Sequence, residues 1–339
     1  MIKRSFLLLS VVIIAFVSCG ENNDDESTDF ENPTQSQSGN QQGTSQSEST
    51  GGVSQGNLIK EIIMTAPREG TRRYSFSYDD SGNLMKIKLE YAGDTYGRKS
   101  SYVTLKKNNT KSVIITSRSS PMDLPGEEEI PLNSKGYISQ LFQNSGFPVI
   151  VIYGHNSNDY FMGKESSNSH HIEKWTYSDG CLRGVEYSTD NTLFKQNYSY
   201  EMGNELNNAN IDLNYFISYY GRIGHGNYVG LLDDYTREGS LFLFGLLGKK
   251  SKNIISGENY KEQNNGLTKE EQQQTYNYRV FRDGKERIKE IKYNFKGYYV
   301  MLEKTNKNSN NYTEKRTDYE GEADVLIFYE KSNWPNKPY

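Results

Sequence analysis

The sequence predicts a mainly β fold: an antiparallel meander that forms a curled sheet or soluble barrel, with one or two short helices covering or filling it. Two observations predict this class. Apolar and aromatic residues recur at every second position, and clusters of Asp, Asn and Gly separate the runs in which they do so. A third observation limits the size of the core, because only 34% of the 339 residues are hydrophobic and the mean hydropathy is -0.83.

The clearest hairpin covers residues 73–91. Aromatic residues stand two apart before a turn at 79–83, and apolar residues again stand two apart after it. A helix would place its apolar residues three and four apart. The segment is therefore expected to form two strands with one buried face and one wet face.

The same pattern returns along the chain. Hairpins are expected at 172–187 and 276–295, with weaker copies around the turns at 133–136 and 202–204. Further strands are expected at 113–116, 148–153, 298–303 and 324–330. The best strands are expected to have about five to eight residues, as is usual in globular proteins, and successive hairpins of this kind form an antiparallel meander.

Two stretches break the strand rhythm. In 211–220, Leu213, Phe216 and Ile217 stand at helical spacing after Asp212, a candidate N-cap. The stretch 241–247 is apolar and ends at a glycine. Apolar residues at helical spacing indicate packing, so these helices are expected to cover one end of the sheet or to fill its interior.

The N-terminus has the features of a targeting segment. Lys3 and Arg4 precede an apolar stretch at 6–17 that is too short to span a bilayer as a helix, and Ser18 stands directly before Cys19. Here the sequence resembles a bacterial lipoprotein, with residues 16–19 in the place of the lipobox. The resemblance implies that residues 1–18 are a lipoprotein signal peptide and that Cys19 is acylated. It also implies anchoring in the outer membrane, on the cell surface or the periplasmic face.

Residues 19–57 are expected to form a disordered acidic and polar tether. They contain seven acidic residues and no Lys or Arg, and 23 of the 26 residues at 32–57 are Ser, Thr, Gln, Asn or Gly. Residues 58–339 are expected to form a single β-rich domain, in which 37 basic and 36 acidic residues nearly cancel. This balance argues against nucleic acid as a partner.

Three stretches carry a resemblance to a known family. The run 74–84 contains an aromatic strand and its Asp-x-x-Gly turn, 210–216 reads Asn-Ile-Asp-Leu-Asn-Tyr-Phe, and 248–253 reads Gly-Lys-Lys-Ser-Lys-Asn. Together they resemble a domain-of-unknown-function family of Bacteroidetes lipoproteins that is described as having a porin-like fold. The resemblance implies a fold and carries no activity, ligand or catalytic residue.

A search for catalytic chemistry identifies no residue. The chain contains no Gly-x-Ser-x-Gly, His-Glu-x-x-His, phosphate-binding glycine loop or Cys-x-x-Cys. The pair His170-His171 with Glu173 could bind a metal, but adjacent residues of a strand point to opposite faces, so a surface role is favoured. Cys181 is interpreted as a structural thiol. No metal and no cofactor are therefore expected.

Tyrosine is unusually frequent, with 27 Tyr against 14 Phe and 2 Trp. A phenol ring suits a half-wet strand, and exposed tyrosines can also form a platform for sugar rings or for a protein partner. The candidate binding residues are Tyr198, Tyr200, Tyr215, Tyr219 and Tyr220.

Two function hypotheses follow. The first is a membrane-anchored, non-catalytic binding or structural module for a glycan, a peptide or an envelope protein. The second is an envelope hydrolase that uses paired carboxylates, which the sequence cannot identify because two such residues can meet in space from any positions.

Overall fold

The computed structural model describes eleven stretches of the chain. They are 55–66, 70–92, 100–118, 126–145, 147–166, 171–189, 194–218, 241, 243–264, 267–305 and 310–331. All of them belong to one compact unit, 51–339, which is the part of the chain considered below. The expected signal peptide and most of the expected tether, with Cys19, lie outside the described residues.

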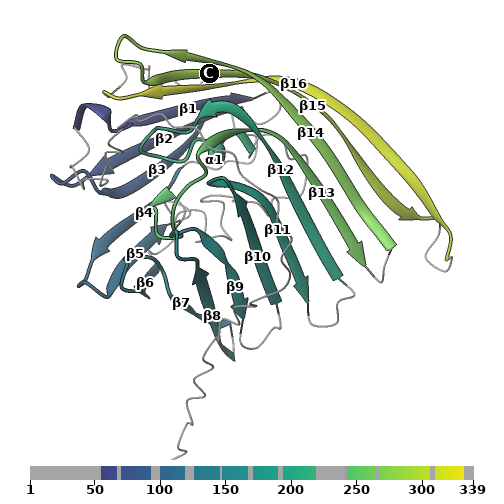
Figure 1. Cartoon of the computed structure of the whole chain (residues 1–339), viewed down its shortest axis with the longest axis horizontal. Helices are drawn as coiled ribbons and strands as arrows, with labels where there is room; N and C mark the ends of the chain where they lie inside the picture. Colours follow the sequence, from purple (N-terminus) through teal and green to yellow (C-terminus); the bar gives the residue numbers. More distant parts are fainter. Residues whose placement is uncertain are drawn as a thin grey trace, which may run out of the picture. The chain divides into compact units, whose positions relative to one another are not determined.

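Sixteen strands form one antiparallel sheet (Figure 1). Neighbours along the chain pair with each other, except that β1 pairs with β16 and the sheet ends at β6 and β7. These two end strands are linked by a single bridge between Leu132 and Ile138, so the sheet curls into a nearly closed barrel. The expected mainly β, antiparallel, barrel-like fold is thereby confirmed.

The eleven strands of the first part of the chain have six to nine residues. They are β1 (Glu61–Ala66), β2 (Gly70–Tyr78), β3 (Leu84–Ala92), β4 (Ser100–Lys107), β5 (Ser112–Arg118), β6 (Gly126–Pro131), β7 (Gln140–Ser145), β8 (Phe147–His155), β9 (Phe161–Ser166), β10 (His171–Ser178) and β11 (Cys181–Thr189). These include the hairpins expected at 73–91 and 172–187.

The five remaining strands are longer, with 12 to 17 residues. They are β12 (Phe194–Leu206), β13 (Asn253–Asn264), β14 (Leu267–Arg282), β15 (Ile288–Lys304) and β16 (Tyr312–Phe328). The expected length of five to eight residues is wrong for this part of the sheet. The stretches expected to be separate strands at 288–295 and 298–303 are one strand, β15, because polar residues continue the ladder of backbone hydrogen bonds where apolar residues end.

Four tight turns share one geometry. In each, the side-chain oxygen of an Asp or Asn accepts hydrogen bonds from the backbone N–H groups two and four residues later. The fourth residue of each turn has a positive φ. The turns begin at Asp79, Asn133, Asn156 and Asp283, and all connect strands at the same end of the sheet.

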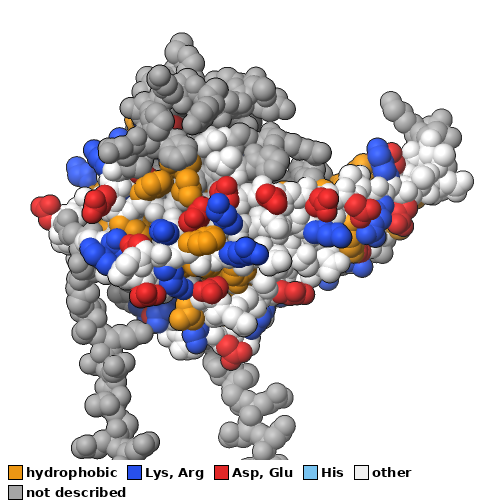
Figure 2. Space-filling model, turned by 90° about the horizontal axis from the view of Figure 1, so that it is seen from above, with side chains coloured by type: hydrophobic (Ala, Val, Ile, Leu, Met, Phe, Trp, Pro, Cys, Tyr) orange, Lys and Arg blue, Asp and Glu red, His pale blue; other side chains and the backbone are white. Residues whose placement is uncertain are grey.

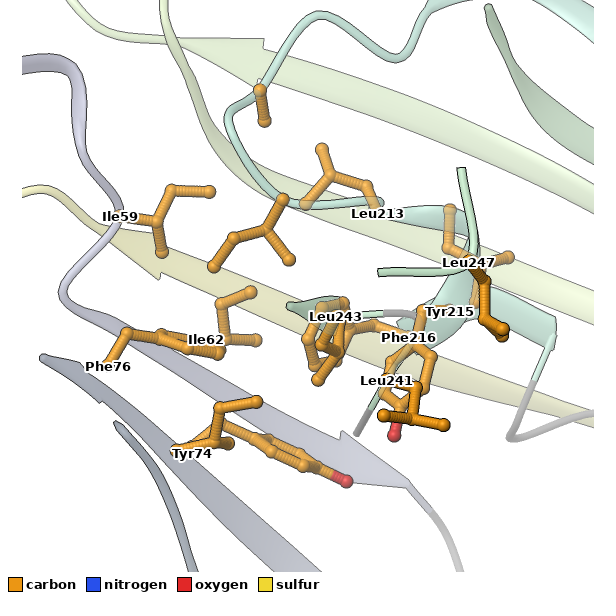
Figure 3. Packing of buried hydrophobic residues seen from close by; sticks show 14 of the residues in the cluster. Ile59, Ile62, Tyr74, Phe76, Leu213, Tyr215, Phe216, Leu241, Leu243 and Leu247 are labelled. Carbon is orange, nitrogen blue, oxygen red and sulfur yellow. The ribbon is translucent and has the colours of Figure 1, made fainter. Parts of the chain in front are cut away.

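The described residues of the connection between β12 and β13, which are 207–218, 241 and 243–252, lie in the interior at that end. Within it, the short helix α1 (Asn214–Ser218) and the helical residues Leu241 and Leu243 lie inside the curled sheet (Figure 3). Phe216 meets Tyr74 edge to face, with ring centroids 5.1 Å apart. The expected interior helix is confirmed, although residues 219 and 220 lie outside the described part of the chain.

Backbone hydrogen bonds fix this connection, which we call the plug, to the turns around it. Ile138 N–H donates to Leu246 O at 2.8 Å, and Lys249 N–H donates to Asp159 O at 2.8 Å. Lys252 N–H donates to Gly180 O at 2.9 Å. The plug therefore closes the end of the sheet at which the tight turns lie.

Candidate functional site: a tyrosine and glutamate face

The tyrosines selected from the sequence do not form one exposed platform. Tyr200 is 5% exposed and Tyr215 is 2% exposed, because both rings belong to the hydrophobic core. The expectation of exposed rings is therefore wrong for these two residues. Tyr198 is half-buried and lies 4.8 Å from the ring of Tyr260, and Tyr219 and Tyr220 lie outside the described residues.

The strand register places polar side chains beside Tyr198 and Tyr200. Residues directly opposite each other in an antiparallel pair share a face of the sheet. Tyr198 is opposite Tyr260 and Tyr200 is opposite Glu258, and the same register continues across β14, β15 and β16. The inner face of the long strands therefore carries a set of tyrosines, glutamates and glutamines.

We call this set the tyrosine–glutamate face. Its members point to the same side of the sheet as the core and lie toward the end opposite the plug. They are Gln196, Tyr198, Tyr200, Glu258, Tyr260, Glu262, Glu270, Gln272, Gln274, Tyr299 and Tyr319.

One group of hydrogen bonds joins β12 to β13. The Tyr260 hydroxyl donates to Glu262 Oε2 at 2.8 Å, and Gln196 Nε2 donates to the same carboxylate oxygen at 3.0 Å. Gln196 Nε2 also lies 3.2 Å from the Tyr260 hydroxyl. Burial raises the pKa of Tyr260 above its ordinary value, and the bond to Glu262 raises it further. The phenol therefore stays protonated and keeps its donor role.

A second group joins β14 to β15 and β16. Gln272 Nε2 donates to the Tyr319 hydroxyl at 2.8 Å, which donates in turn to Gln274 Oε1 at 2.9 Å. The Tyr299 hydroxyl bonds to Glu270, and burial and this carboxylate both raise the pKa of Tyr299. Position 297 is glycine because a Cβ there would lie 2.2 Å from a backbone oxygen and 2.9 Å from the Tyr319 hydroxyl.

Exposure changes across the face. Glu258 and Gln274 are 6% and 1% exposed, whereas Glu262, Glu270 and Tyr299 are half-buried. Glu262 and Glu270 are direct cross-strand partners. Like charges in such positions are unfavourable unless donors offset them. The face thus offers half-buried carboxylates toward the strand ends, and a buried carboxylate with buried amides deeper in.

The outer face of the same strands has a different character. Lys292, Lys296 and Arg316 are exposed there, and Arg316 pairs with Asp318 at 3.0 Å. Tyr298, next to Tyr299 in the chain, points outward and donates to Glu271 Oε1 at 2.9 Å. Basic and acidic side chains are interspersed over the face of the molecule shown in Figure 2. The polar inner face is therefore set against an outer face of mixed charge.

Glu173, considered above with His170 and His171 as a metal ligand, lies on the row that continues this face, opposite Tyr187. His170 lies outside the described residues, and Cys181 and His155 lie apart from the face.

Cys181 is buried and its thiol lies 3.5 Å from Asn253 Oδ1, near the plug. His155 stacks on Tyr137, with centroids 5.2 Å apart, and burial lowers its pKa. Among the described residues, no three His, Cys, Asp or Glu side chains are grouped so as to hold a metal ion. In the same part of the chain, no helix is both long enough and apolar enough to cross a membrane.

Most members of the tyrosine–glutamate face were missed by sequence reasoning. The available signal was polar alternation: Glu258, Tyr260 and Glu262 stand two apart, and so do Glu270, Gln272 and Gln274. Without apolar residues, this spacing does not identify a strand. The pairing of the strands also had to be known before their residues could be placed together.

Fold and site together define a class: a plugged, nearly closed antiparallel barrel of 16 strands with a polar inner face at one end. The chain is similar in structure to a porin-like protein from Bacteroides uniformis, with a TM-score of 0.50 and 15% sequence identity. The match covers 80% of this chain and 98% of that protein, and it supports the porin-like fold expected from the sequence. No protein-family model matches the sequence, and a search of curated proteins finds no relative.

Proposed function

We propose that this protein is a lipid-anchored envelope module that binds a glycan, a peptide or a segment of an envelope protein on its tyrosine–glutamate face. The observation that carries the proposal is the group of eleven inward Tyr, Glu and Gln side chains at the end of the barrel away from the plug, where Met301, Lys315 and Thr317 complete the same cross-strand rows. Binding sites combine aromatic surface with a few placed polar groups, and this face contains both.

The outer face supports a lipid anchor rather than insertion of the sheet. If the long strands crossed a bilayer, Lys292, Lys296 and Arg316 would face lipid. A Lys or Arg at the bilayer midplane of a barrel costs roughly 2–4 kcal/mol. Acyl chains on Cys19 would hold the protein at the membrane without that cost, since each buried methylene contributes about 0.8 kcal/mol.

The binding proposal is tested with two neighbouring tyrosines of β15. Tyr299 faces inward and bonds to Glu270, whereas Tyr298 faces outward and bonds to Glu271. Full-length protein in detergent is applied to a glycan array and to envelope extracts, as wild type, Tyr299→Ala and Tyr298→Ala. We expect saturable binding that falls at least tenfold in Tyr299→Ala and stays within twofold of wild type in Tyr298→Ala. Equal losses in both variants, or no saturable binding by the wild type, would refute the proposal.

The anchor is tested by Cys19→Ala. The substituted protein should leave the membrane fraction or keep its signal peptide, because no thiol remains to be acylated. Fractionation at high salt and the apparent mass on a gel measure both effects. A Cys19→Ala protein of mature size that still sediments with membranes would contradict the lipoprotein proposal.

Hydrolysis by paired carboxylates is the second candidate, favoured by the cross-strand pair Glu262 and Glu270. Both glutamates already accept hydrogen bonds from tyrosines of the same face, which favours an acceptor role in binding. Any saccharide that binds can be incubated with the protein and assayed for new reducing ends. Product that disappears in both Glu262→Gln and Glu270→Gln would favour the hydrolase.

A further inference from the structure

One buried amide on the tyrosine–glutamate face has a nitrogen without a hydrogen-bond partner among the described residues. Gln274 is 1% exposed, and its Oε1 accepts a hydrogen bond from the Tyr319 hydroxyl. Its Nε2 has no hydrogen-bond partner within the described structure. Buried donors are normally paired, so an unpaired one beside a candidate site points to an acceptor that comes from outside the chain.

The carboxylates of the same face can accept further hydrogen bonds. Glu262 and Glu270 are half-buried cross-strand partners, and ionised carboxylates only accept hydrogen bonds. Glu262 and Glu270 already accept hydrogen bonds from Tyr260 and Tyr299, so a ligand that lies along β13 and β14 would add donors to their remaining lone pairs and would bring an acceptor to Gln274. A hydroxyl group is both donor and acceptor, and a saccharide carries hydroxyls on adjacent carbons. The half-buried rings of Tyr198 and Tyr299 add apolar surface beside them.

Charge narrows the ligand class further. The eleven residues of the face include three glutamates and no Lys or Arg. The row of Glu262 and Glu270 continues across the sheet to Lys164 on one side and to Lys315 on the other. Both lysines are paired with carboxylates: Lys164 with Glu173 at 3.5 Å, and Lys315 with Glu303 at 3.5 Å. An acidic ligand would therefore meet like charge on this face.

We propose that the ligand of this face is a saccharide without acidic groups, either neutral or carrying amino groups, and that Glu262 and Glu270 exclude uronic acids. This inference rests on the proposed binding function and specifies its ligand. In it, Gln274 donates to a sugar oxygen while the two glutamates accept from sugar hydroxyls.

The test compares matched probes on the full-length protein in detergent. Galactose and galacturonate hexamers differ only at carbon 6, which is the hydroxymethyl carbon in the first and the carboxylate carbon in the second. Chitosan hexamer supplies amino groups. Glucose hexamers of several linkages are included with their glucuronate counterparts. Calorimetry measures the affinities, and thermal unfolding confirms that each variant is folded.

We expect neutral or amino hexamers to bind at least tenfold more tightly than uronate hexamers. The double variant Glu262→Gln/Glu270→Gln should bring this ratio near one, whereas Glu271→Gln on the outer face should leave it unchanged. Gln274→Met should weaken the binding of the preferred hexamer at least tenfold. Its control is Gln273→Met, at an exposed outward position of the same strand.

Three results would overturn the inference. Equal or tighter binding of uronate hexamers would show that Glu262 and Glu270 do not exclude acidic saccharides. Binding of peptides alone, if lost in Tyr299→Ala, would show that the ligand is not a saccharide while leaving the proposed function intact. No binding of any probe, together with no saturable partner on the array or in extracts, would overturn both.

Discussion

The two ends of the barrel interior differ in chemistry although the same kind of strand builds both. Around the plug, the inner face is apolar, with Phe76, Ile291 and Val325 buried in one cluster. Farther along the long strands, the inner positions become tyrosine, glutamine and glutamate. The ladder of backbone hydrogen bonds is the same at both ends, so side chains at one end can stabilise the fold while those at the other are available for recognition.

Removing the central ring of the plug is expected to have the largest effect on stability. Phe216 is 0% exposed and meets Tyr74 and Phe76 edge to face. Phe216→Ala should lower the free energy of unfolding by about 3–5 kcal/mol, because a buried aromatic ring is replaced by a cavity. Guanidinium unfolding followed by circular dichroism measures the loss. The matched control is Phe281→Ala on β14, where the ring is 38% exposed and the expected loss is under about 1 kcal/mol. Similar losses in both variants would show that stability is not concentrated in the plug.

The turns at the plugged end allow a smaller, opposite change. The fourth residue of each shared turn has a positive φ, which is 85° at Gly136 and 58° at Glu286. Glu286→Gly should raise the free energy of unfolding by about 1 kcal/mol, because a side chain is strained in this conformation. Gly136→Ala should lower it by a similar amount. Thermal unfolding of both variants measures the effects, and a Glu286→Gly protein less stable than wild type would contradict the expectation.

The smallest expected effect concerns acid stability. The hydrogen bond from Arg287 and backbone N–H groups lower the pKa of Asp283 to about 2. A carboxylate whose pKa is lowered by folding stabilises the protein above its unfolded pKa of about 3.9, and this contribution is lost as the pH falls through the folded value. Asp283→Asn should therefore flatten the fall of the unfolding midpoint between about pH 4 and pH 2.

Asparagine is a suitable replacement in this turn. Asn133 and Asn156 occupy the equivalent first position of two sister turns and accept the same backbone hydrogen bonds. The change thus removes the charge and keeps the turn. Unfolding midpoints from pH 6 to pH 2 measure the effect. An acid profile identical to that of the wild type would show that Asp283 does not contribute to it.

The sequence by itself determined the fold class and several of the turns, although the turn expected at 202–204 is wrong because these residues lie within β12. Strand alternation is visible residue by residue, and the turns at Asp79 and Asp283 depend on bonds between residues only two and four positions apart. The interior role of 211–217 was also readable, because Leu213, Phe216 and Ile217 stand at helical spacing. Such features depend on local geometry, and one chain segment is enough to define them.

Only the tertiary structure decided the closure and the candidate site. β1 and β16 pair although nearly the whole sequence of the domain separates them. Glu262 faces Glu270 only because β13 and β14 pair in one register. A shift of that register by one residue would turn every side chain of a strand to the other face. Tyr215 is buried for the same kind of reason, since its exposure depends on a core assembled from distant strands. Polar residues give weak local signals, so their grouping is set by pairing over long distances in the chain.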